Sequence, residues 1–269
     1  MSRRNTTEWD GETLEALQAR WDRESVYLYG KIDSTNEAAR ELADDGAPAG
    51  TVVLCREQTA GKGRAGHAWY SPRDVGLYLS LILRPTDLSH PAMISILAGL
   101  GVAERLDERF RGLAPGLKWP NDLVAGGLKL GGVLAEASWS ESGPRCLVLG
   151  VGINVRPLGR EVPADFAERA TSVEAVLGES VPLVEVADCV VGGLETWLTR
   201  APASLEGDLL ALVDRYDWLR DRRARLTLPG DEHSQPGTCV GIAPDGALLF
   251  RPDRGALRRV TDGVVDPWA

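Results

Sequence analysis

The sequence has few lysines and lacks any long apolar run. Its lysines are Lys31, Lys62, Lys118 and Lys129. No apolar stretch approaches the roughly 20 residues that a membrane-spanning helix needs. The polar N-terminus, MSRRNTTEWDGE, also lacks the apolar segment of a secretory signal. These absences predict a cytoplasmic protein with no membrane partner.

Cysteine patterns typical of metal sites and disulfide scaffolds are also missing. The four cysteines are scattered without a CxxC pair, at Cys55, Cys146, Cys189 and Cys239. No histidine stands at metal-ligand spacing from them. We therefore interpret the cysteines as reduced thiols, most of them buried.

The chain lacks the basic charge balance of a nucleic-acid-binding protein. Its net charge is -9 and its pI is near 5.0, whereas a surface that meets phosphates needs an excess of lysine and arginine. Hydrophobic residues make up 43% and charged residues 26% of the chain, as in an ordinary globular protein. We therefore expect no nucleic-acid partner.

Hydrophobic patterning divides the chain into three parts. Residues 1 to 24 are polar with one short helical pattern, which predicts a helix or a tail. Residues 25 to 219 alternate strand-like runs with helical patterns, two of which span residues 163 to 177 and 182 to 200. Residues 220 to 269 contain short β-type runs separated by turns, which predicts a small β-barrel domain.

A glycine-rich segment at residues 58 to 66 follows a strand-like run. Its glycines match the G-x-G-x-x-G pattern literally, at Gly61, Gly63 and Gly66. A dinucleotide-binding loop must open a helix, whereas this loop runs into Trp69, Pro72 and another strand. A P-loop is excluded as well, because Gly63 stands where Ser or Thr should bind magnesium.

The same segment carries two cations, Lys62 and Arg64, between its glycines. Glycine lets the backbone approach a ligand closely, and the two cations can face a phosphate or a carboxylate. The alternative is a flexible hairpin whose charges are solvated. Taken alone, the loop leaves both interpretations open.

Four segments together resemble the biotin–protein ligase family. They occur in family order and at family-like spacing, and they cover roughly residues 30 to 155. The pair KWPND and KLGG is the most specific of them. The segments are Ser34-Thr35-Asn36, Gln58 to Gly66 with Trp69-Tyr70-Ser71-Pro72, Lys118-Trp119-Pro120-Asn121-Asp122 with Lys129-Leu130-Gly131-Gly132, and Gly150-Val151-Gly152-Ile153-Asn154.

The resemblance implies an α+β fold with a central mixed β-sheet flanked by helices. This fold is shared by biotinyl and lipoyl ligases and is related to class II aminoacyl-tRNA synthetases. Residues 25 to 219 would form the catalytic domain that binds biotin and ATP. Residues 220 to 269 would form a small Src-homology-like β-barrel, in agreement with the strand pattern there.

The resemblance also implies an activity. The protein would use ATP to convert biotin into biotinyl-5′-AMP and then transfer biotin to one lysine of a biotin carboxyl carrier domain of a biotin-dependent carboxylase. Family members include monomers and homodimers. Some carry an N-terminal winged-helix domain of about sixty residues that makes them repressors, whereas only about 24 residues precede the first strand here. We therefore expect no repressor activity.

For biotin, the resemblance implies a polar site for the ureido head beside an apolar wall. Ser34, Thr35 and Asn36 would bind the ureido group, although Ser34 and Glu37 also have capping-box spacing. Gly131 and Gly132 would let a strand lie against the bicyclic ring, unless they form a β-bulge. The other implied biotin contacts are Gln58, Lys62, Gly63, Arg64 and Lys129.

For ATP, the chemistry requires cations, because two anions must meet and charge builds on the phosphate oxygens. Lys129 and Arg64 are assigned this role, with Lys62 holding phosphates beside them. Asp122 is a candidate to orient or deprotonate the acceptor lysine, unless it is only a turn residue. Mg²⁺ would accompany ATP, with Asn121 or Asp122 as its ligands. The implied ATP and adenylate contacts are Lys62, Arg64, Trp69, Asn121, Lys129 and Asn154.

The loop departs from the family pattern at two positions. Many members have arginine in place of Lys62 and of His67. Lysine keeps the charge but loses the bidentate fork of arginine, which puts the affinity for phosphate in doubt rather than the reaction.

Three alternative functions remain open. A lipoate or octanoate protein ligase would need a purely apolar slot. A non-catalytic sensor would bind biotinyl-adenylate without transferring biotin. A nucleic-acid-binding module would use the arginines of the last domain, Arg251, Arg254, Arg258 and Arg259.

Overall fold

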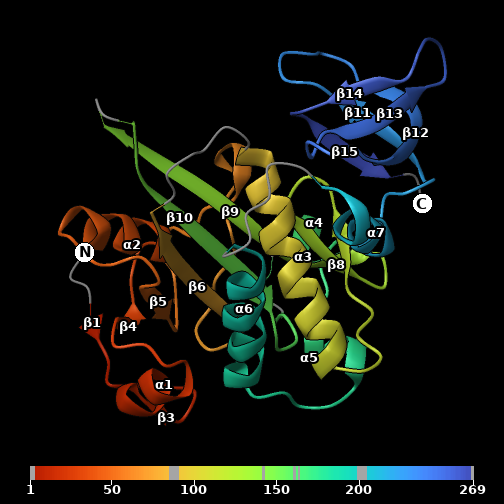
Figure 1. Cartoon of the computed structure of the whole chain (residues 1–269). Helices are drawn as coiled ribbons and strands as arrows, with labels where there is room; N and C mark the ends of the chain where they lie inside the picture. The colour runs from red at the N-terminus through yellow and green to blue at the C-terminus, as the bar shows by residue number, and fades with distance from the viewer. Residues whose placement is uncertain are drawn as a thin grey trace.

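An eight-stranded mixed sheet, here called the main sheet, forms the centre of the molecule (Figure 1). The computed structural model describes residues 4–84, 91–140, 143–159, 162, 164–198 and 205–267. Strands β4 and β5 run parallel, and the other neighbouring pairs of the main sheet run antiparallel. In spatial order the strands are β1 (Arg4–Asn5), β4 (Val26–Lys31), β5 (Val52–Cys55), β6 (Gly76–Leu83), β10 (Gly143–Asn154), β9 (Leu128–Ser140), β8 (Asp122–Ala125) and β7 (Gly116–Lys118).

Helices cover both faces of the main sheet, so the predicted α+β fold class is confirmed. Alternate residues of β5 point to opposite faces: Val52 and Leu54 join the core beneath α3 and α6, whereas Val53 and Cys55 join the core beneath α2. No described helix is long and apolar enough to cross a membrane. The helices are α1 (Leu14–Arg20), α2 (Thr35–Asp44), α3 (Pro91–Arg109), α4 (Ala164–Ala167), α5 (Val173–Leu177), α6 (Leu183–Leu198) and α7 (Gly207–Tyr216).

A second sheet of five antiparallel strands forms the small C-terminal β domain (residues 223–267). The short β-type runs in the sequence predicted this domain, but they did not include its last strand, at Val264–Pro267. Figure 1 shows it beside α7, at the end of the molecule away from α1. Its strands are β11 (Arg223–Thr227), β12 (Gln235–Ile242), β13 (Leu248–Pro252), β14 (Arg258–Val260) and β15 (Val264–Pro267).

The N-terminal segment docks onto the main sheet through both apolar and polar contacts. It contains β2 (Glu8–Trp9) and β3 (Glu12–Thr13), and the Trp9 side chain is only 1% exposed. Asp10 accepts a hydrogen bond from the Val184 amide at the start of α6 (3.0 Å) and pairs with Arg156 (3.2 Å). Beyond its helix, the segment therefore forms strands and contributes to the core.

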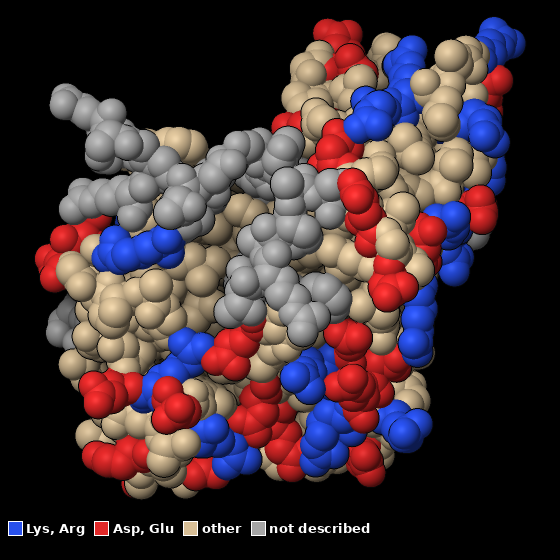
Figure 2. Space-filling view, in the orientation of Figure 1, with Lys and Arg blue, Asp and Glu red and all other residues tan. Residues whose placement is uncertain are grey.

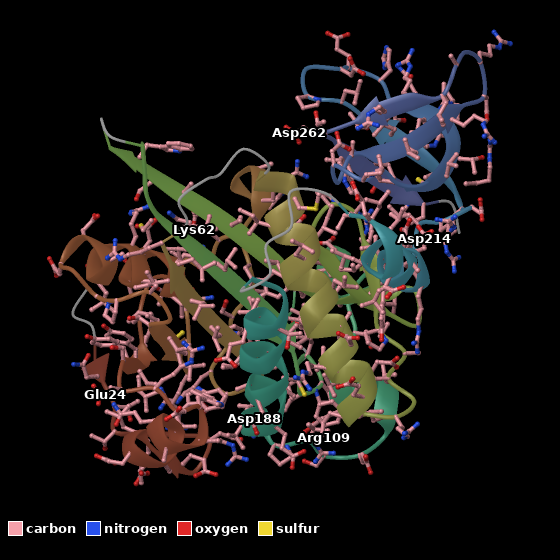
Figure 3. All side chains as sticks on the ribbon, in the orientation of Figure 1. Glu24, Lys62, Arg109, Asp188, Asp214 and Asp262 are labelled. Atoms are coloured by element: carbon pink, nitrogen blue, oxygen red, sulfur yellow. The ribbon has the colours of Figure 1, made fainter. Side chains whose placement is uncertain are left out.

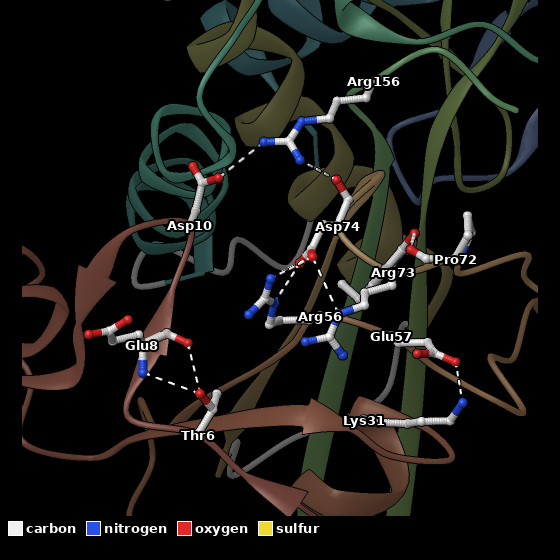
Figure 4. Close-up of polar contacts among 11 residues, drawn as sticks. Thr6, Glu8, Asp10, Lys31, Arg56, Glu57, Pro72, Arg73, Asp74 and Arg156 are labelled. Carbon is white, nitrogen blue, oxygen red and sulfur yellow. Dashed lines mark hydrogen bonds and ion pairs between the residues drawn. The ribbon is translucent and has the colours of Figure 1, made fainter.

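A polar network continues from Arg156 to the ends of the glycine-rich loop (Figure 4). Arg156 donates to the Asp74 carbonyl (2.6 Å), and Arg56 makes two hydrogen bonds of 2.6 Å to the Asp74 carboxylate. Arg56 precedes the loop and Asp74 follows it. The network therefore clamps the base of the loop to the main sheet.

The helix predicted at residues 163 to 177 is wrong in its extent. The structure has two short helices, α4 and α5, separated by an extended segment. In this segment the Arg169 carbonyl accepts from the Lys129 amide (2.8 Å) and the Thr171 amide donates to the Lys129 carbonyl (2.9 Å). Pairing with β9 thus replaces the hydrogen bonds of a continuous helix. The helix α7 was not predicted at all.

All four cysteines are free and buried, as expected. Burial raises the pKa of Cys239 to about 12, so this thiol is neutral at physiological pH. On the surface, acidic and basic side chains are intermixed over the face that Figure 2 shows.

The buried carboxyl group of Asp217 predicts a pH-dependent stability. Its side chain is 7% exposed, and Oδ2 has no hydrogen-bond partner among the described residues. Burial raises the Asp217 pKa from 3.8 to about 6. The folded protein therefore keeps this proton up to about pH 6 whereas the unfolded chain loses it near pH 4, so this group's contribution to stability falls as pH rises through that window.

Asp217→Asn should remove this fall, which amounts to at most about 3 kcal/mol in the free energy of unfolding. Urea unfolding between pH 4 and pH 7.5 measures it. The control Asp253→Asn changes an exposed carboxylate of the C-terminal β domain. Arg223 lowers the pKa of that carboxyl group, so its own effect is confined to acidic pH and the variant should keep the wild-type slope above about pH 5. Equal slopes in Asp217→Asn and wild type would contradict the prediction.

Candidate active site

A cavity of about 450 Å³ lies where the main sheet, the glycine-rich loop and the C-terminal β domain meet. Most of the residues predicted for the site line it. These are Ser34, Thr35, Asn36, Gln58, Lys62, Gly63, Arg64, Trp69, Asn121, Asp122, Lys129 and Gly132. The structure therefore brings together segments that lie far apart in the sequence.

The register of the main sheet places four of its strands side by side under this cavity. Tyr78 of β6 lies opposite Gly152 of β10, Gly152 lies opposite Gly132 of β9, and Gly132 lies opposite Asp122 of β8. Residues that lie directly opposite each other in antiparallel strands point to the same face. One row across the sheet therefore connects the KWPND and KLGG segments with the GVGIN segment.

Gln58 is held by a hydrogen-bond network at the start of α2. Its Oε1 accepts from the Thr35 amide (2.8 Å) and from the Thr35 hydroxyl (3.2 Å), and its Nε2 donates to Ser71 Oγ (2.8 Å). These partners fix the orientation of the Gln58 amide, with its oxygen toward Thr35 and its nitrogen toward Ser71. One of the two Nε2 hydrogens remains for a ligand.

The capping box expected at Ser34 and Glu37 is not formed. Ser34 is the N-cap residue of α2, but its side chain makes no cap hydrogen bond. Glu37 instead forms ion pairs with Arg40 and Lys62. The Ser34 hydroxyl lies at the wall of the cavity and is not used by the helix.

Asn36 and Thr35 are positioned by two residues that the sequence did not single out, Ser80 and Glu136. Ser80 Oγ lies 2.6 Å from Asn36 Oδ1 and 2.8 Å from Thr35 Oγ1, and Asn36 Nδ2 donates to Glu136 Oε2 (2.6 Å). Ser80 is fully buried. Its one signal in the sequence was a hydroxyl in the middle of the apolar run GLYLSLIL.

Two glycines of β10 allow α2 and Trp69 to approach the sheet. A Cβ atom at Gly150 would lie 2.3 Å from Asn36 Oδ1, and one at Gly152 would lie 2.6 Å from Trp69 Nε1. Contacts this short do not occur between real side chains, so a larger residue would push either group away. The GVGIN segment is thus explained by packing beneath the site.

Two predicted site residues do not reach the cavity. A Cβ atom at Gly131 would lie 2.6 Å from the Gly152 carbonyl oxygen, so this glycine is required by the neighbouring strand. Asn154 is buried, and its Nδ2 donates to the Thr171 carbonyl (3.0 Å). Asn154 therefore fixes the segment beside Lys129 and does not line the cavity.

Each of the three predicted phosphate-binding cations is paired with a carboxylate. Lys129 Nζ lies 2.7 Å from Asp122 Oδ1, Lys62 pairs with Glu37, and Arg64 pairs with Asp262. Lys129 Nζ also lies 5.4 Å from the centre of the Trp69 ring. The cavity of this acidic protein is therefore lined by cations whose positions are set by ion pairs.

Phe166 and Arg169 line the cavity although the sequence did not indicate them. Phe166 meets the Trp69 ring edge to face, with the ring centres 6.5 Å apart. The backbone pairing with Lys129 brings this segment over the site. A helical pattern predicted for these residues hid their role, because the extended segment between α4 and α5 depends on a distant strand.

Asn121 and Asp122 provide oxygen atoms in the cavity, the donor type that Mg²⁺ prefers. Among the described residues there is no cluster of three or more His, Cys, Asp or Glu side chains that could hold a metal ion. This donor set suits a metal ion that arrives with phosphate ligands of its own.

Comparison with known proteins gives relatives that span nearly the whole chain. Residues 29–154 match the model of the biotin/lipoate A/B protein ligase family. The biotin--[acetyl-CoA-carboxylase] ligase of Paracoccus denitrificans is 33% identical over 244 residues, which cover 85% of this chain and 95% of the relative. The bifunctional ligase/repressor BirA of Bacillus spizizenii is 37% identical over 231 residues, which cover 83% and 68%.

A solved structure shares the fold. The biotin protein ligase from Aquifex aeolicus in complex with biotin and ATP is 26% identical, with a TM-score of 0.76 over 91% of this chain and 99% of that chain. The identity to the Paracoccus relative over 95% of its length, the shared fold and the order of the motifs lead to one conclusion: the chain belongs to the biotin–protein ligase family.

Proposed function

We propose that this protein activates biotin with ATP as biotinyl-5′-AMP and then transfers biotin to a lysine of a carrier protein in the cytoplasm. The observation that carries the proposal is one cavity with two different ends. A fixed hydrogen-bond network around Thr35, Asn36 and Gln58 lines it together with cations that include Lys62, Arg64 and Lys129. A ligand with a polar head, an apolar body and an anionic tail fits a cavity with both kinds of lining.

At the first end, the ureido group of biotin would meet Ser34, Thr35, Asn36 and Gln58. A ureido group has one carbonyl acceptor and two N–H donors, so it needs partners of both kinds. The hydroxyl of Ser34 and the remaining Nε2 hydrogen of Gln58 supply them. Gly132 and the neighbouring apolar strand residues would bound the bicyclic ring.

At the second end, the carboxylate of biotin attacks the α-phosphorus of ATP. An acyl–phosphate bond forms, and the bond from the α-phosphorus to the oxygen bridging the β-phosphate breaks, which releases pyrophosphate. Lys129 and Arg64 stabilise the charge on the phosphate oxygens, with Lys62 beside them. Trp69 and Phe166 would bound the adenine. Mg²⁺ would shield the phosphates, with Asn121 or Asp122 as protein ligands.

In the second step, the amine of the acceptor lysine attacks the acyl carbon and AMP leaves. Asp122 is the carboxylate beside Lys129, so it can orient the incoming amine and take its proton. The Paracoccus relative acts, by its name, on acetyl-CoA carboxylase. We take the carrier domain of a biotin-dependent carboxylase as the acceptor class here.

Lys129→Ala should lower the rate of biotinyl-adenylate formation by about a hundredfold to a thousandfold, because it removes a cation from the reacting phosphate. Lys31→Ala is the matched control, since Lys31 pairs with Glu57 outside the cavity and should retain activity. The assay contains labelled biotin, ATP, Mg²⁺ and a biotin carrier domain, with a lipoyl domain tested in parallel. It measures adenylate formation and the transfer of label to protein.

The same assay separates the alternatives. Label on the biotin carrier alone supports the ligase. Label on the lipoyl domain would support a lipoate-type ligase, and adenylate without transfer would support a sensor. Absence of adenylate in the wild type would contradict the proposed function.

Ser80→Ala should raise the KM for biotin about tenfold, because it releases the Asn36 amide and the Thr35 hydroxyl from their fixed positions. The KM for ATP and kcat at saturating biotin should change less than about twofold. The control Ser138→Ala removes a hydroxyl that contacts Cys146, outside the cavity. An equal effect of both variants would show that Ser80 contributes to stability alone.

The glycine-rich loop should become less accessible when the adenylate forms, because an anhydride must be kept from water. Trypsin cleavage after Arg64 should slow when biotin and ATP are added together. Mass spectrometry of the fragments follows this cut, and an unchanged rate would argue against closure of the loop.

A further inference from the structure

The glycine-rich loop is attached at its tip to the C-terminal β domain. Arg64 Nη1 donates to the Gly263 carbonyl (3.2 Å), and the Arg64 guanidinium forms an ion pair with Asp262. Gly263 and Arg64 line the same cavity. One side chain thus connects the loop that faces the phosphate end of the cavity with a domain 198 residues further along the chain.

The C-terminal β domain is a firm anchor for this contact. Trp119 Nε1 donates to the Gly246 carbonyl (3.0 Å), and the Leu205 amide donates to the Pro244 carbonyl (2.7 Å). Trp119 is buried, and apolar residues of the C-terminal β domain belong to the same core as α3 and α6. A change in the Arg64 contact therefore moves the loop more readily than the domain.

The loop is the weakly held partner. Ala65, Gly66 and His67 are exposed. Besides the contacts of Arg64, the loop is attached near its tip by the ion pair of Lys62 with Glu37. Loops with few buried contacts open at low free-energy cost. Arg64 and Lys62 therefore determine where the tip of the loop lies.

Asp262 differs from the other two carboxylates that pair with the cavity cations. Glu37 and Asp122 lie in the same part of the chain as their lysines, within residues 25–219, whereas Asp262 comes from the C-terminal β domain and is 61% exposed. Figure 3 labels Asp262 on that domain and Lys62 near α2. A carboxylate and a phosphate both bind the donor face of a guanidinium, so they compete for it.

We propose that Asp262 sets the affinity for ATP by holding Arg64 on the C-terminal β domain. The triphosphate takes Arg64 from this carboxylate, and the loop tip is released from the domain as the nucleotide binds. Asp262 acts through Arg64 and is a positioning residue in this sense. The inference rests on the proposed function, because it needs ATP as the ligand of the cation end.

Asp262→Asn should lower the KM for ATP by up to about fivefold, the scale of an exposed ion pair. The dissociation constant for biotin alone should change less than the KM for ATP, because biotin is held mainly at the ureido end on α2. Without ligands, trypsin should cut after Arg64 severalfold faster in the variant than in the wild type. Added biotin and ATP should protect the loop in both proteins.

The matched control is Asp253→Asn. Asp253 forms an exposed ion pair with Arg223 in the same domain and does not line the cavity. It changes the net charge equally and should leave the KM for ATP and the trypsin rate at wild-type values. In an Arg64→Ala background, Asp262→Asn should have no further effect on the KM for ATP, because its partner is gone.

Biotin-dependent exchange between ATP and pyrophosphate gives the KM for ATP, and calorimetry gives the affinity for biotin. A KM for ATP that is unchanged or raised in Asp262→Asn, or lowered equally in Asp253→Asn, would overturn the inference. Wild-type protein that shows no biotin-dependent exchange would instead contradict the proposed function. Biotin-dependent exchange by the wild-type protein therefore distinguishes failure of this inference from failure of the proposed function.

Discussion

The close approach of α2 and Trp69 to β10 is the constraint on which the rest of the site depends. Gly150 and Gly152 leave no side chain between the strand and these groups, so Asn36 and Trp69 lie directly against the sheet. Opposite Gly150 lies Ser80, which holds Asn36 from the neighbouring strand. A buried polar group needs a partner, and this register provides it. The hydrogen-bonding end of the cavity is thus part of the core, and its side chains are held as rigidly as the core residues around them.

The cation end is built in a different way. Lys62 and Arg64 are carried by the glycine-rich loop and Lys129 by the start of β9, and ion pairs with carboxylates determine where these three cations lie. The most exposed of these pairs is that of Arg64 with Asp262, and exposed ion pairs contribute little to stability, so a polyphosphate can replace this carboxylate at small cost. A chain of net charge -9 thereby presents a local site for an anion. A rigid hydrogen-bonding surface and more adjustable cations therefore lie side by side in one cavity.

Much of the site could be predicted because its residues occur in short, ordered motifs. The Ser34-Thr35-Asn36 triplet, the loop cations and the pair of Asp122 with Lys129 all reach the cavity. Gly131 and Asn154 do not, because their neighbours in the sheet require them for packing. The helix expected at residues 163 to 177 failed because the segment pairs with Lys129, a contact that no local pattern encodes.

By itself, the sequence indicated the family through the order of its motifs, and the α+β class followed from that resemblance. The strand pattern of residues 220 to 269 predicted the small C-terminal β domain, since periodicity and motif order are local properties of the chain. Only the tertiary structure decided that Ser80 and Glu136 support the triplet, that Phe166 and Arg169 line the cavity, and that Asp262 meets Arg64. The physical reason is that these contacts depend on strand register and on the docking of one domain against another. Both are settled by packing of the whole core, which brings together residues too far apart in the chain for any spacing rule to relate.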